Sequence, residues 1–236
     1  MCRYLYTYCI KTYISKFYIC EKNATIKMMD IKDAYNKWSS QYNSNQNKTR
    51  DLEGEVLRET LKYYQSENLL EIGCGTGKNT EWFVKNYAQV TSVDFSENML
   101  AVAKAKVKST NVEFIQADIS NAWTFVKYKY DLISFSLVLE HIVDLNHVFK
   151  EALNAVKDSG FIYIGELHPF KQYTGSKARF ETGEGTETVT CFTHHITEFI
   201  NAADKYGFEL KKMGEHFDEE DKNGLPRILT LLFQKK

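Results

Sequence analysis

LLEIGCGTGKNTEWF, residues 69–83, passes from an apolar run through a glycine-rich turn into a helical pattern. Glycines occupy positions 73, 75 and 77, and Glu71 stands just before them. Such a turn lets a ligand lie against bare backbone, and the free N–H groups at the start of the next helix suit a carboxylate as well as a phosphate. Taken alone, the turn is also compatible with a tight connection that binds nothing.

Two acidic residues further along the chain indicate the kind of ligand. Asp94 ends the expected strand in VTSVDFS, and Asp118 follows the expected strand in VEFIQADIS. A carboxylate at the end of the second strand can accept hydrogen bonds from both hydroxyls of a ribose. An acid followed by a backbone N–H can bind the edge of an adenine. The glycine turn and the two acids therefore predict an adenosine ligand.

The glycine spacing argues against a dinucleotide. The dinucleotide-binding fingerprint is G-x-G-x-x-G, and Lys78 occupies the place of its third glycine. A nicotinamide-dependent oxidoreductase would share the expected fold, but it would need that glycine and would leave Asp118 unexplained.

Strands alternate with helices along most of the chain. The helix after the fourth strand is expected at 148–156, ending near Gly160, and residues 166–194 look looser, with several glycines. Apolar strands alternating with helices predict a parallel sheet covered on both faces, which binds ligands at the carboxyl ends of its strands. The expected strands are 68–72, 89–93, 112–116, 130–135, 161–165, 208–213 and 227–233.

Composition restricts the partners and the compartment. The 236 residues carry a net charge of −1, without the basic excess typical of nucleic-acid binding, so no nucleic-acid partner is expected. No apolar stretch reaches the length of a membrane span. The 5 cysteines are odd in number and scattered, which favours a reducing compartment, the cytoplasm, and predicts no metal site.

Residues 1–28 differ from the rest of the chain, being rich in tyrosine and cysteine. We expect a poorly ordered N-terminal extension there. An arm that touches a membrane or binds a partner is the alternative.

Four motifs together resemble the class I S-adenosylmethionine-dependent methyltransferases, in the subgroup that includes small-molecule and ubiquinone-type enzymes. The motifs are LLEIGCGTG, VTSVDFSENML, VEFIQADIS and YDLISFSLVLEHI, in that order. The resemblance covers residues 29–236. It implies an α/β fold, a Rossmann-like doubly wound seven-stranded sheet that is mostly parallel with an antiparallel last strand and has helices on both faces.

The resemblance also implies a cofactor, S-adenosylmethionine, with S-adenosylhomocysteine as product. Residues 29–64 would form N-terminal helices and a lid, and residues 166–195 a variable substrate-binding insertion. The positions implied to bind the cofactor are Glu71, Gly73, Gly75 and Gly77 for its methionine part, Asp94 and Phe95 for the ribose and adenosine, Asp118 and Ile119 for the adenine, Ser136 and Leu137 beside the sulfonium, and Tyr42 as a closing side chain.

Methyl transfer by in-line displacement to oxygen or nitrogen gains from a general base. His141, in LEHI, is the candidate, since it follows the fourth strand; a structural hydrogen-bonding role is the alternative. Tyr173, Lys177 and Arg179 could hold an anionic substrate or form a solvated face. The residues expected on the substrate side are Tyr35, Trp38, Glu166, His168 and His195.

Other functions remain compatible with the same fold. A non-catalytic binding module would be expected to lose the glycines or Asp94, and both are present. Amide-directed enzymes of this fold often carry an N/D-P-P-Y-type motif where this chain reads SFSLVLEH. A small-molecule acceptor is therefore favoured over RNA or protein. The sequence indicates neither the identity of the acceptor nor the oligomeric state.

Overall fold

The computed structural model describes residues 31–39, 42, 47–64, 66–182, 185–218 and 224–236 of the chain. The N-terminal extension expected at 1–28 lies outside the described residues. Within the described part, no helix combines the length and apolar character needed to cross a membrane.

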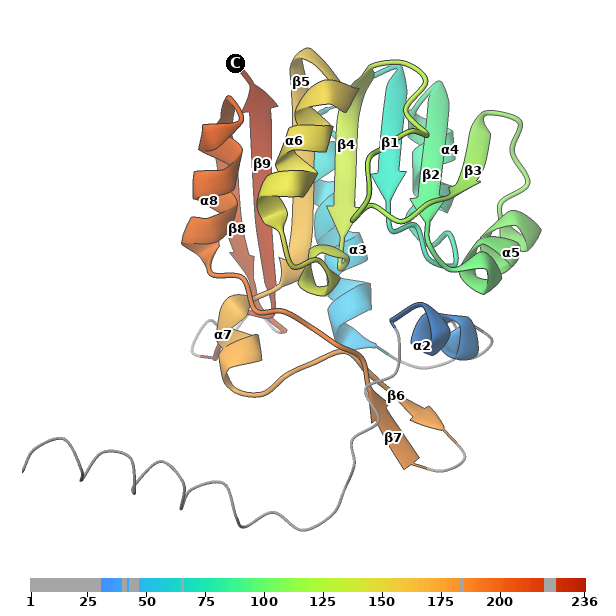
Figure 1. Cartoon of the computed structure of the whole chain (residues 1–236), viewed down its shortest axis with the longest axis vertical. Helices are drawn as coiled ribbons and strands as arrows, with labels where there is room; N and C mark the ends of the chain where they lie inside the picture. The colour runs from blue at the N-terminus through green and yellow to red at the C-terminus, as the bar shows by residue number, and fades with distance from the viewer. Residues whose placement is uncertain (1–30, 40–41, 43–46, 65, 183–184, 219–223) are drawn as a thin grey trace, which may run out of the picture.

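The centre of the fold is a seven-stranded sheet with the order β3-β2-β1-β4-β5-β9-β8 (Figure 1). Neighbouring strands from β3 to β5 pair in parallel, and β9 pairs antiparallel with both β5 and β8. The order reverses between β1 and β4, which confirms the doubly wound fold with its antiparallel last strand. The strands are β1 (Asn68–Ile72), β2 (Gln89–Asp94), β3 (Val112–Gln116), β4 (Tyr130–Ser136), β5 (Val156–Leu167), β8 (Phe208–His216) and β9 (Ile228–Lys235).

Helices cover both faces of this sheet. In Figure 1, α6 (Leu145–Ala155) and α8 (Ile196–Lys205) lie in front of it, and α3 (Lys48–Leu61) and α4 (Thr80–Asn86) lie behind. The fifth helix, α5 (Glu97–Lys106), contacts β2 and β3. Side-chain caps start several of them: Ser96 Oγ accepts from Met99 N at the start of α5, as its place in the sequence predicts.

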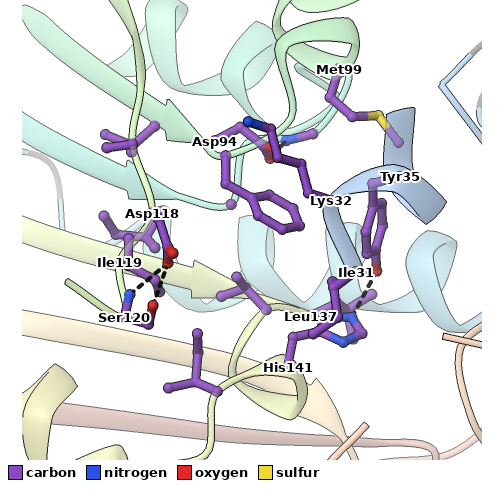
Figure 2. A pocket seen from close by; sticks show the side chains of 18 of the residues that line it. Ile31, Lys32, Tyr35, Asp94, Met99, Asp118, Ile119, Ser120, Leu137 and His141 are labelled. Atoms are coloured by element: carbon purple, nitrogen blue, oxygen red, sulfur yellow. Dashed lines mark hydrogen bonds between the residues drawn. The ribbon is translucent and has the colours of Figure 1, made fainter. Parts of the chain in front are cut away.

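The helix α2 (Ile31–Trp38) lies at the end of the sheet where the parallel strands finish. Its Asn36 Oδ1 accepts from Ser96 Oγ at 2.6 Å, and Asn36 O accepts from Asn98 Nδ2 at 3.1 Å, which ties α2 to the start of α5. Ala34 and Trp38 pack against Met99. Figure 2 shows the opposite side of α2, where the side chain of Tyr35 points toward the end of β4.

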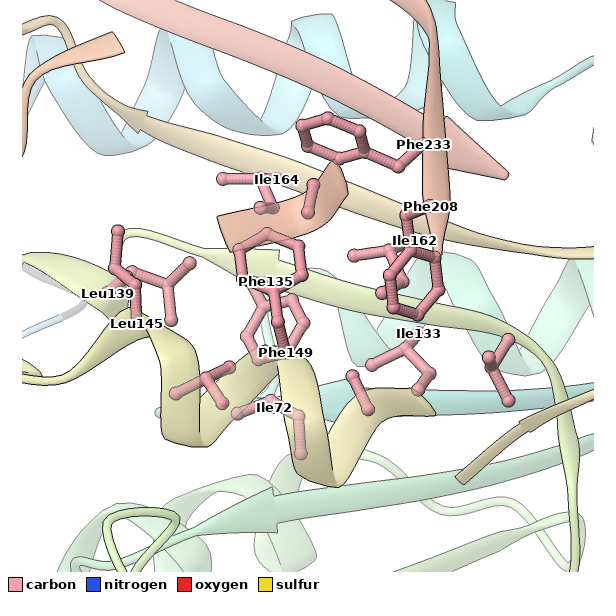
Figure 3. Packing of buried hydrophobic residues seen from close by; sticks show 14 of the residues in the cluster. Ile72, Ile133, Phe135, Leu139, Leu145, Phe149, Ile162, Ile164, Phe208 and Phe233 are labelled. Atoms are coloured by element: carbon pink, nitrogen blue, oxygen red, sulfur yellow. The ribbon is translucent and has the colours of Figure 1, made fainter. Parts of the chain in front are cut away.

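The largest core lies between the sheet and the layer of α6 and α8 (Figure 3). Phe149 of α6 is central to it, with its ring 5.8 Å from Phe233 of β9 and 6.0 Å from Phe208 of β8. On the other face, Leu57 and Leu61 of α3 are fully buried against strand residues. Burial of these apolar side chains stabilises the sheet. The residues at its carboxyl edge are therefore not needed for the core and can be polar.

Two segments differ from the sequence-based expectation. Gly160 lies inside β5 and does not end a helix: α6 ends at Ala155, and β5 begins at Val156. A Cβ on Gly160 would lie 2.7 Å from Val156 Cγ2 and 2.9 Å from Lys157 O, so close packing requires this glycine. The looser region contains α7 (Pro169–Tyr173) and a hairpin of β6 (Arg179–Thr182) and β7 (Gly185–Thr188).

Candidate active site

The three glycines of the turn after β1 have different surroundings. Gly73 has φ +72°, and a Cβ there would lie 2.8 Å from Val138 Cγ2. Gly77 has φ +75° and faces Ala103 of α5, 3.2 Å from where its Cβ would be. Gly75 has φ +51° and open space beside it. The first and third glycines therefore allow close packing, and the second leaves bare backbone facing a cavity.

Asp94, at the end of β2, is buried beside this turn. Its Oδ2 accepts from Gly75 N at 2.8 Å, and its Oδ1 accepts from Ser96 N at 2.9 Å. Burial raises the pKa of this carboxyl to about 6. The two carboxylate oxygens together have about four lone pairs, so the group can still accept a hydrogen bond from a ligand hydroxyl.

Glu71 makes hydrogen bonds inside the turn. Its Oε2 accepts from Thr80 Oγ1 at 2.6 Å and from Ser92 Oγ at 2.7 Å. Burial raises the pKa of the Glu71 carboxyl to about 7. The side chain links β1 to β2 and α4, and Glu71, like Gly77, does not line the cavity described next.

A cavity of about 370 Å³ opens at the carboxyl ends of β1, β2 and β4, with α2 on one side (Figure 2). We call it the Asp94 cavity. Ile31, Lys32, Met99 and Ser120 also line it. Met99 and Ser120 lie inside two of the quoted motifs without having been predicted as site residues, and Ile31 and Lys32 lie in none. The sequence-predicted residues that it brings together are Tyr35, Tyr42, Gly73, Gly75, Asp94, Phe95, Asp118, Ile119, Ser136, Leu137 and His141.

Asp118 stands at the far side of this cavity from His141 in Figure 2. Its Oδ1 accepts from Ser120 N at 2.9 Å and from Ser120 Oγ at 2.7 Å, and its Oδ2 accepts from Asn121 Nδ2 at 3.1 Å. These bonds orient an exposed carboxylate, while Ile119 beside it is buried. The pair offers an acceptor next to an apolar surface.

Tyr35 and His141 meet on the other side. The Tyr35 hydroxyl lies 2.8 Å from His141 Nε2, and His141 Nδ1 lies 2.8 Å from Thr190 O. A carbonyl oxygen only accepts, so Nδ1 carries the proton of the neutral ring, and Nε2 accepts from the phenol. Burial raises the pKa of Tyr35 well above its usual range. The lone pair of His141 is therefore directed toward a side chain that lines the cavity.

Glu166, at the end of β5, holds the segment that carries His141. Its Oε1 accepts from Val138 N at 2.9 Å and from Leu139 N at 2.8 Å, at the start of the short helix η1 (Leu139–His141). Burial raises the pKa of Glu166 to about 8. Leu137, just before η1, has φ +54°, a conformation that a leucine rarely adopts. Through its two hydrogen bonds Glu166 stabilises this bend, and it lies outside the Asp94 cavity.

The remaining predicted histidines lie elsewhere. His168 is fully buried, accepts from Phe170 N through Nδ1, and lies 3.0 Å from Glu215 Oε1 through Nε2. Burial lowers the pKa of His168. His195 begins α8, with its ring 2.6 Å from the Tyr173 hydroxyl. Neither lines the Asp94 cavity.

A second cavity, of about 550 Å³, adjoins the first and shares Tyr35, Tyr42 and Leu137 with it. Trp38 also lines this cavity. We call it the basic cavity because its charged lining consists of Lys48, Arg50, Lys177 and Arg227, with Glu140 as the one acid. Lys177 is anticipated by the sequence as a binder of anions. Lys48 and Arg50 could have been noticed in the sequence, because cations are unfavourable in the first turn of a helix and their presence there can indicate a binding role.

One group of metal-type donors occurs in the described part of the chain. Donor atoms of Glu140, His141 and Cys191 lie within 4.8 Å of one another. Both ring nitrogens of His141 already have hydrogen-bonding partners, Tyr35 and Thr190. The sequence predicts no metal, and the spacing of these residues would not have suggested this group.

Comparison with known proteins supports a methyltransferase. Residues 70–164 match a family model described as a methyltransferase domain. The chain is 24% identical over 227 residues to an uncharacterised methyltransferase of Emericella nidulans, covering 78% of each chain. It is 29% identical over 154 residues to a ubiquinone biosynthesis O-methyltransferase of Hydrogenovibrio crunogenus, covering 62% of each.

A solved structure has the same fold. The N-methyltransferase NodS of Bradyrhizobium japonicum, in complex with S-adenosyl-L-homocysteine, superposes with a TM-score of 0.66 at 16% identity, covering 88% of this chain and 99% of that one. The chain is a methyltransferase with the class I fold, and the comparisons support S-adenosylmethionine as its cofactor. The Asp94 cavity fits that cofactor, because it offers a buried carboxylate with free lone pairs, open glycine backbone and an apolar surface next to Asp118.

Proposed function

We propose that this enzyme methylates an oxygen or nitrogen atom of a small molecule. The observation that carries the proposal is the common wall of the two cavities, formed by Tyr35, Tyr42 and Leu137. The Asp94 cavity would hold the methyl donor, and the basic cavity would hold the acceptor. A cavity of about 550 Å³ is the size of a small-molecule site. The names of an O-methyltransferase and an N-methyltransferase among the relatives are consistent with either acceptor atom.

The cofactor-binding roles rest on the polar groups around the Asp94 cavity. We assign the ribose hydroxyls to Asp94 and the adenine amine to Asp118, with Phe95 and Ile119 as apolar surface. Gly73 and Gly75 would lie against the amino-acid part, and Ser136 and Leu137 near the sulfonium. Glu71 and Gly77 would act indirectly, because the Glu71 carboxylate holds the turn from inside and Gly77 packs on α5.

When bound, the cofactor supplies an electrophilic methyl group. The protein must then orient the acceptor, exclude water and take up a proton. Tyr35 lines both cavities and donates to His141 Nε2. We assign His141 as the base: as the acceptor O–H or N–H loses its proton to the Tyr35 oxygen, the phenolic proton passes to Nε2. Thr190 O keeps the ring in the tautomer that this transfer needs.

The chain segments around the two cavities have proposed roles as well. Residues 29–64 would form the lid, since α2 provides Tyr35 to both cavities and Trp38 to the basic cavity. Residues 166–195 would form the substrate-binding insertion, since the turn at 174–178 lines the basic cavity. Glu166, His168 and His195 would support this region through hydrogen bonds rather than touch the acceptor.

The small-molecule proposal extends to partners and compartment. We expect no nucleic-acid partner, because the net charge of −1 leaves no basic excess outside local patches. We place the enzyme in the cytoplasm, consistent with its free cysteines, Cys74 and Cys191 among the described residues.

The test begins with calorimetric titration of S-adenosylmethionine and S-adenosylhomocysteine into the wild-type protein, Asp94→Ala, and the exposed control Glu113→Gln. Binding is expected in the wild type and the control and lost in Asp94→Ala. A screen of phenols, carboxylates and amines, read by release of S-adenosylhomocysteine, then tests the acceptor class. Turnover on RNA or protein with none on any small molecule would overturn the proposal.

A further inference from the structure

We propose that the basic cavity is a binding site for an anionic group, so that the methyl acceptor is a small molecule with a carboxylate or phosphate-type group at one end. The inference rests on the proposed function, in which this cavity takes the acceptor. No sequence motif assigns such a site, and Lys177 is the only lining cation that the sequence suggests as a binder of anions. It follows from the charges that three separate segments of the chain bring to one cavity.

The charged residues that line the basic cavity are mostly cations. Lys48 and Arg50 come from the first turn of α3, Lys177 from the turn before β6, and Arg227 from the start of β9. Glu140 is the one acid among the lining residues. Cations from distant parts of a chain repel one another, and convergence around a cavity raises the local potential for an anion. An anion bound there would relieve the repulsion.

Two of these cations have their charge available. Lys48 and Lys177 are exposed and form no ion pair with any residue whose side chain the structure describes. Asp218, which pairs with Arg227, is also near enough to Lys48 for that lysine to contribute, after Arg227, to the lowered pKa of its carboxyl. The guanidinium groups are more constrained. Arg227 is paired with Asp218 and donates to Thr49 Oγ1 at 3.0 Å. Arg50 lies beside Asp51 and over the Tyr42 ring. The arginines therefore shape the wall, and the two lysines are the exposed cations that an anion can contact.

The start of α3 adds a second source of positive potential. Asn47 Oδ1 caps Arg50 N at 3.0 Å, and Asn47 O accepts from Asp51 N at 2.9 Å. The helix has 14 residues, and its positive end faces the cavity through Lys48, Thr49 and Arg50. The same turn contains Asp51, which pairs with Arg50 and with Lys78, so Lys48 is the cation that remains unfavourable at this end of the helix. The arrangement becomes favourable when an anion binds there.

The position of the cavity relates the anion to the chemistry. Tyr35 and Leu137 separate it from the Asp94 cavity, and Tyr35 hydrogen-bonds with His141. A molecule whose anionic end lies near Lys48 and Lys177 would direct its other end toward Tyr35. The charged end would then set the orientation, and the hydroxyl or amine at the other end would be the atom methylated.

The test uses the full-length protein saturated with S-adenosylhomocysteine. Phenyl phosphate, benzoate and neutral benzyl alcohol are titrated calorimetrically into the wild type, into Lys48→Gln/Lys177→Gln, and into the control Lys127→Gln/Lys205→Gln. The control removes the same charge from exposed lysines outside the cavity. We expect at least one anion to bind the wild type and the control, about tenfold more weakly to the cavity variant, and benzyl alcohol not to bind measurably.

The outcomes separate the proposals. The anion that binds more tightly identifies the group, carboxylate or phosphate. Equal binding of benzyl alcohol and the anions, equal loss in both double variants, or no anion binding would overturn the anion site. S-adenosylhomocysteine is titrated first into each protein, so failure of the cofactor site, and with it of the proposed function, is seen separately.

Discussion

The hydroxyl of Tyr35 lies 2.8 Å from Nε2 of His141, so α2 and η1 meet through one hydrogen bond at the wall between the two cavities. The other ring nitrogen of His141 is held by Thr190 O. In the proposed mechanism this bond is the route from His141 to the acceptor, through a side chain 106 residues earlier in the chain.

The first prediction concerns this pair. Tyr35→Phe and His141→Asn should each lower kcat by about 10²-fold or more, the usual range for a lost acid–base group. Affinity for S-adenosylhomocysteine should stay within about threefold in both. The double variant should be no slower than the worse single variant, since both act on one proton. Tyr173→Phe, which removes a hydroxyl bonded to His195 outside both cavities, is the control.

Steady-state rates with the acceptor from the screen and calorimetry with S-adenosylhomocysteine provide the measurements. Single variants whose losses multiply in the double variant would show that the two residues act independently. A parallel loss of cofactor affinity would assign them a binding role in place of proton transfer.

The second prediction separates the glycines. Gly73→Ala should destabilise the fold by about 2–4 kcal/mol, because it adds a Cβ 2.8 Å from Val138 Cγ2 and also has positive φ. Gly75→Ala should cost only about 1 kcal/mol, since its surroundings are open. It should nevertheless weaken cofactor binding, because its methyl group would enter the Asp94 cavity.

Urea unfolding and calorimetry distinguish the two effects. Val138→Ala should recover part of the stability lost in Gly73→Ala, since it removes Cγ2, at 2.8 Å, although Cβ, at 2.9 Å, remains. If the double variant is as unstable as the sum of the single variants, contact with the Val138 Cγ atoms is not responsible for the loss.

The sequence predicts best those features that are formed by residues close together in the chain. The strands at 68–72 and 112–116 agree with β1 and β3 residue for residue: β1 is a short buried apolar run, and β3 is a half-buried edge strand. The strand-end part of the Asp94 cavity was predictable, since Gly73, Asp94 and Asp118 lie at or just after the ends of expected strands. The basic cavity was not, because Lys48, Lys177 and Arg227 become neighbours only after folding. Gly160 was misread because a glycine after a helix usually ends it, while here it permits a close strand contact.

The third prediction is a fall in stability as pH rises above neutrality. Burial raises the pKa values of Glu53 and Glu71 to about 7 and of Glu166 to about 8. The folded state therefore keeps protons that the unfolded state has released, and stability is lost as pH rises through these values. The Tm should be lower at about pH 8.5 than at about pH 6.5. Below that window the lowered pKa of buried His168 acts in the opposite direction.

Glu166→Gln isolates one of these groups. The amide oxygen can still accept from Val138 N and Leu139 N, but it does not titrate. The variant should show a smaller fall in Tm across the same window, while Glu113→Gln, exposed and paired with Lys127, should behave as the wild type. Identical pH profiles for Glu166→Gln and the wild type would mean that Glu166 is ionised in the fold.

The fourth prediction tests the attachment of α2. Asn36→Ala removes the acceptor of Ser96 Oγ without changing any residue that lines the Asp94 cavity. We expect faster dissociation of S-adenosylhomocysteine, by about tenfold, from the loss of about 1–1.5 kcal/mol of hydrogen bonding. Stopped-flow displacement measures this rate. An unchanged rate would show that packing of Trp38 and Ala34 on Met99, together with the bond from Asn98 Nδ2 to Asn36 O that the variant keeps, is enough to hold the helix.

The position of α2 has a consequence for the order of events in each catalytic cycle. The helix rests on α5, beside the strand end that carries Asp94, and its Tyr35 and Trp38 also border the second cavity. One element thus covers the donor and forms part of the acceptor's wall. Steady-state kinetics should therefore be sequential and ordered, with the donor entering first and its demethylated product leaving last, and that product should inhibit competitively with the donor alone.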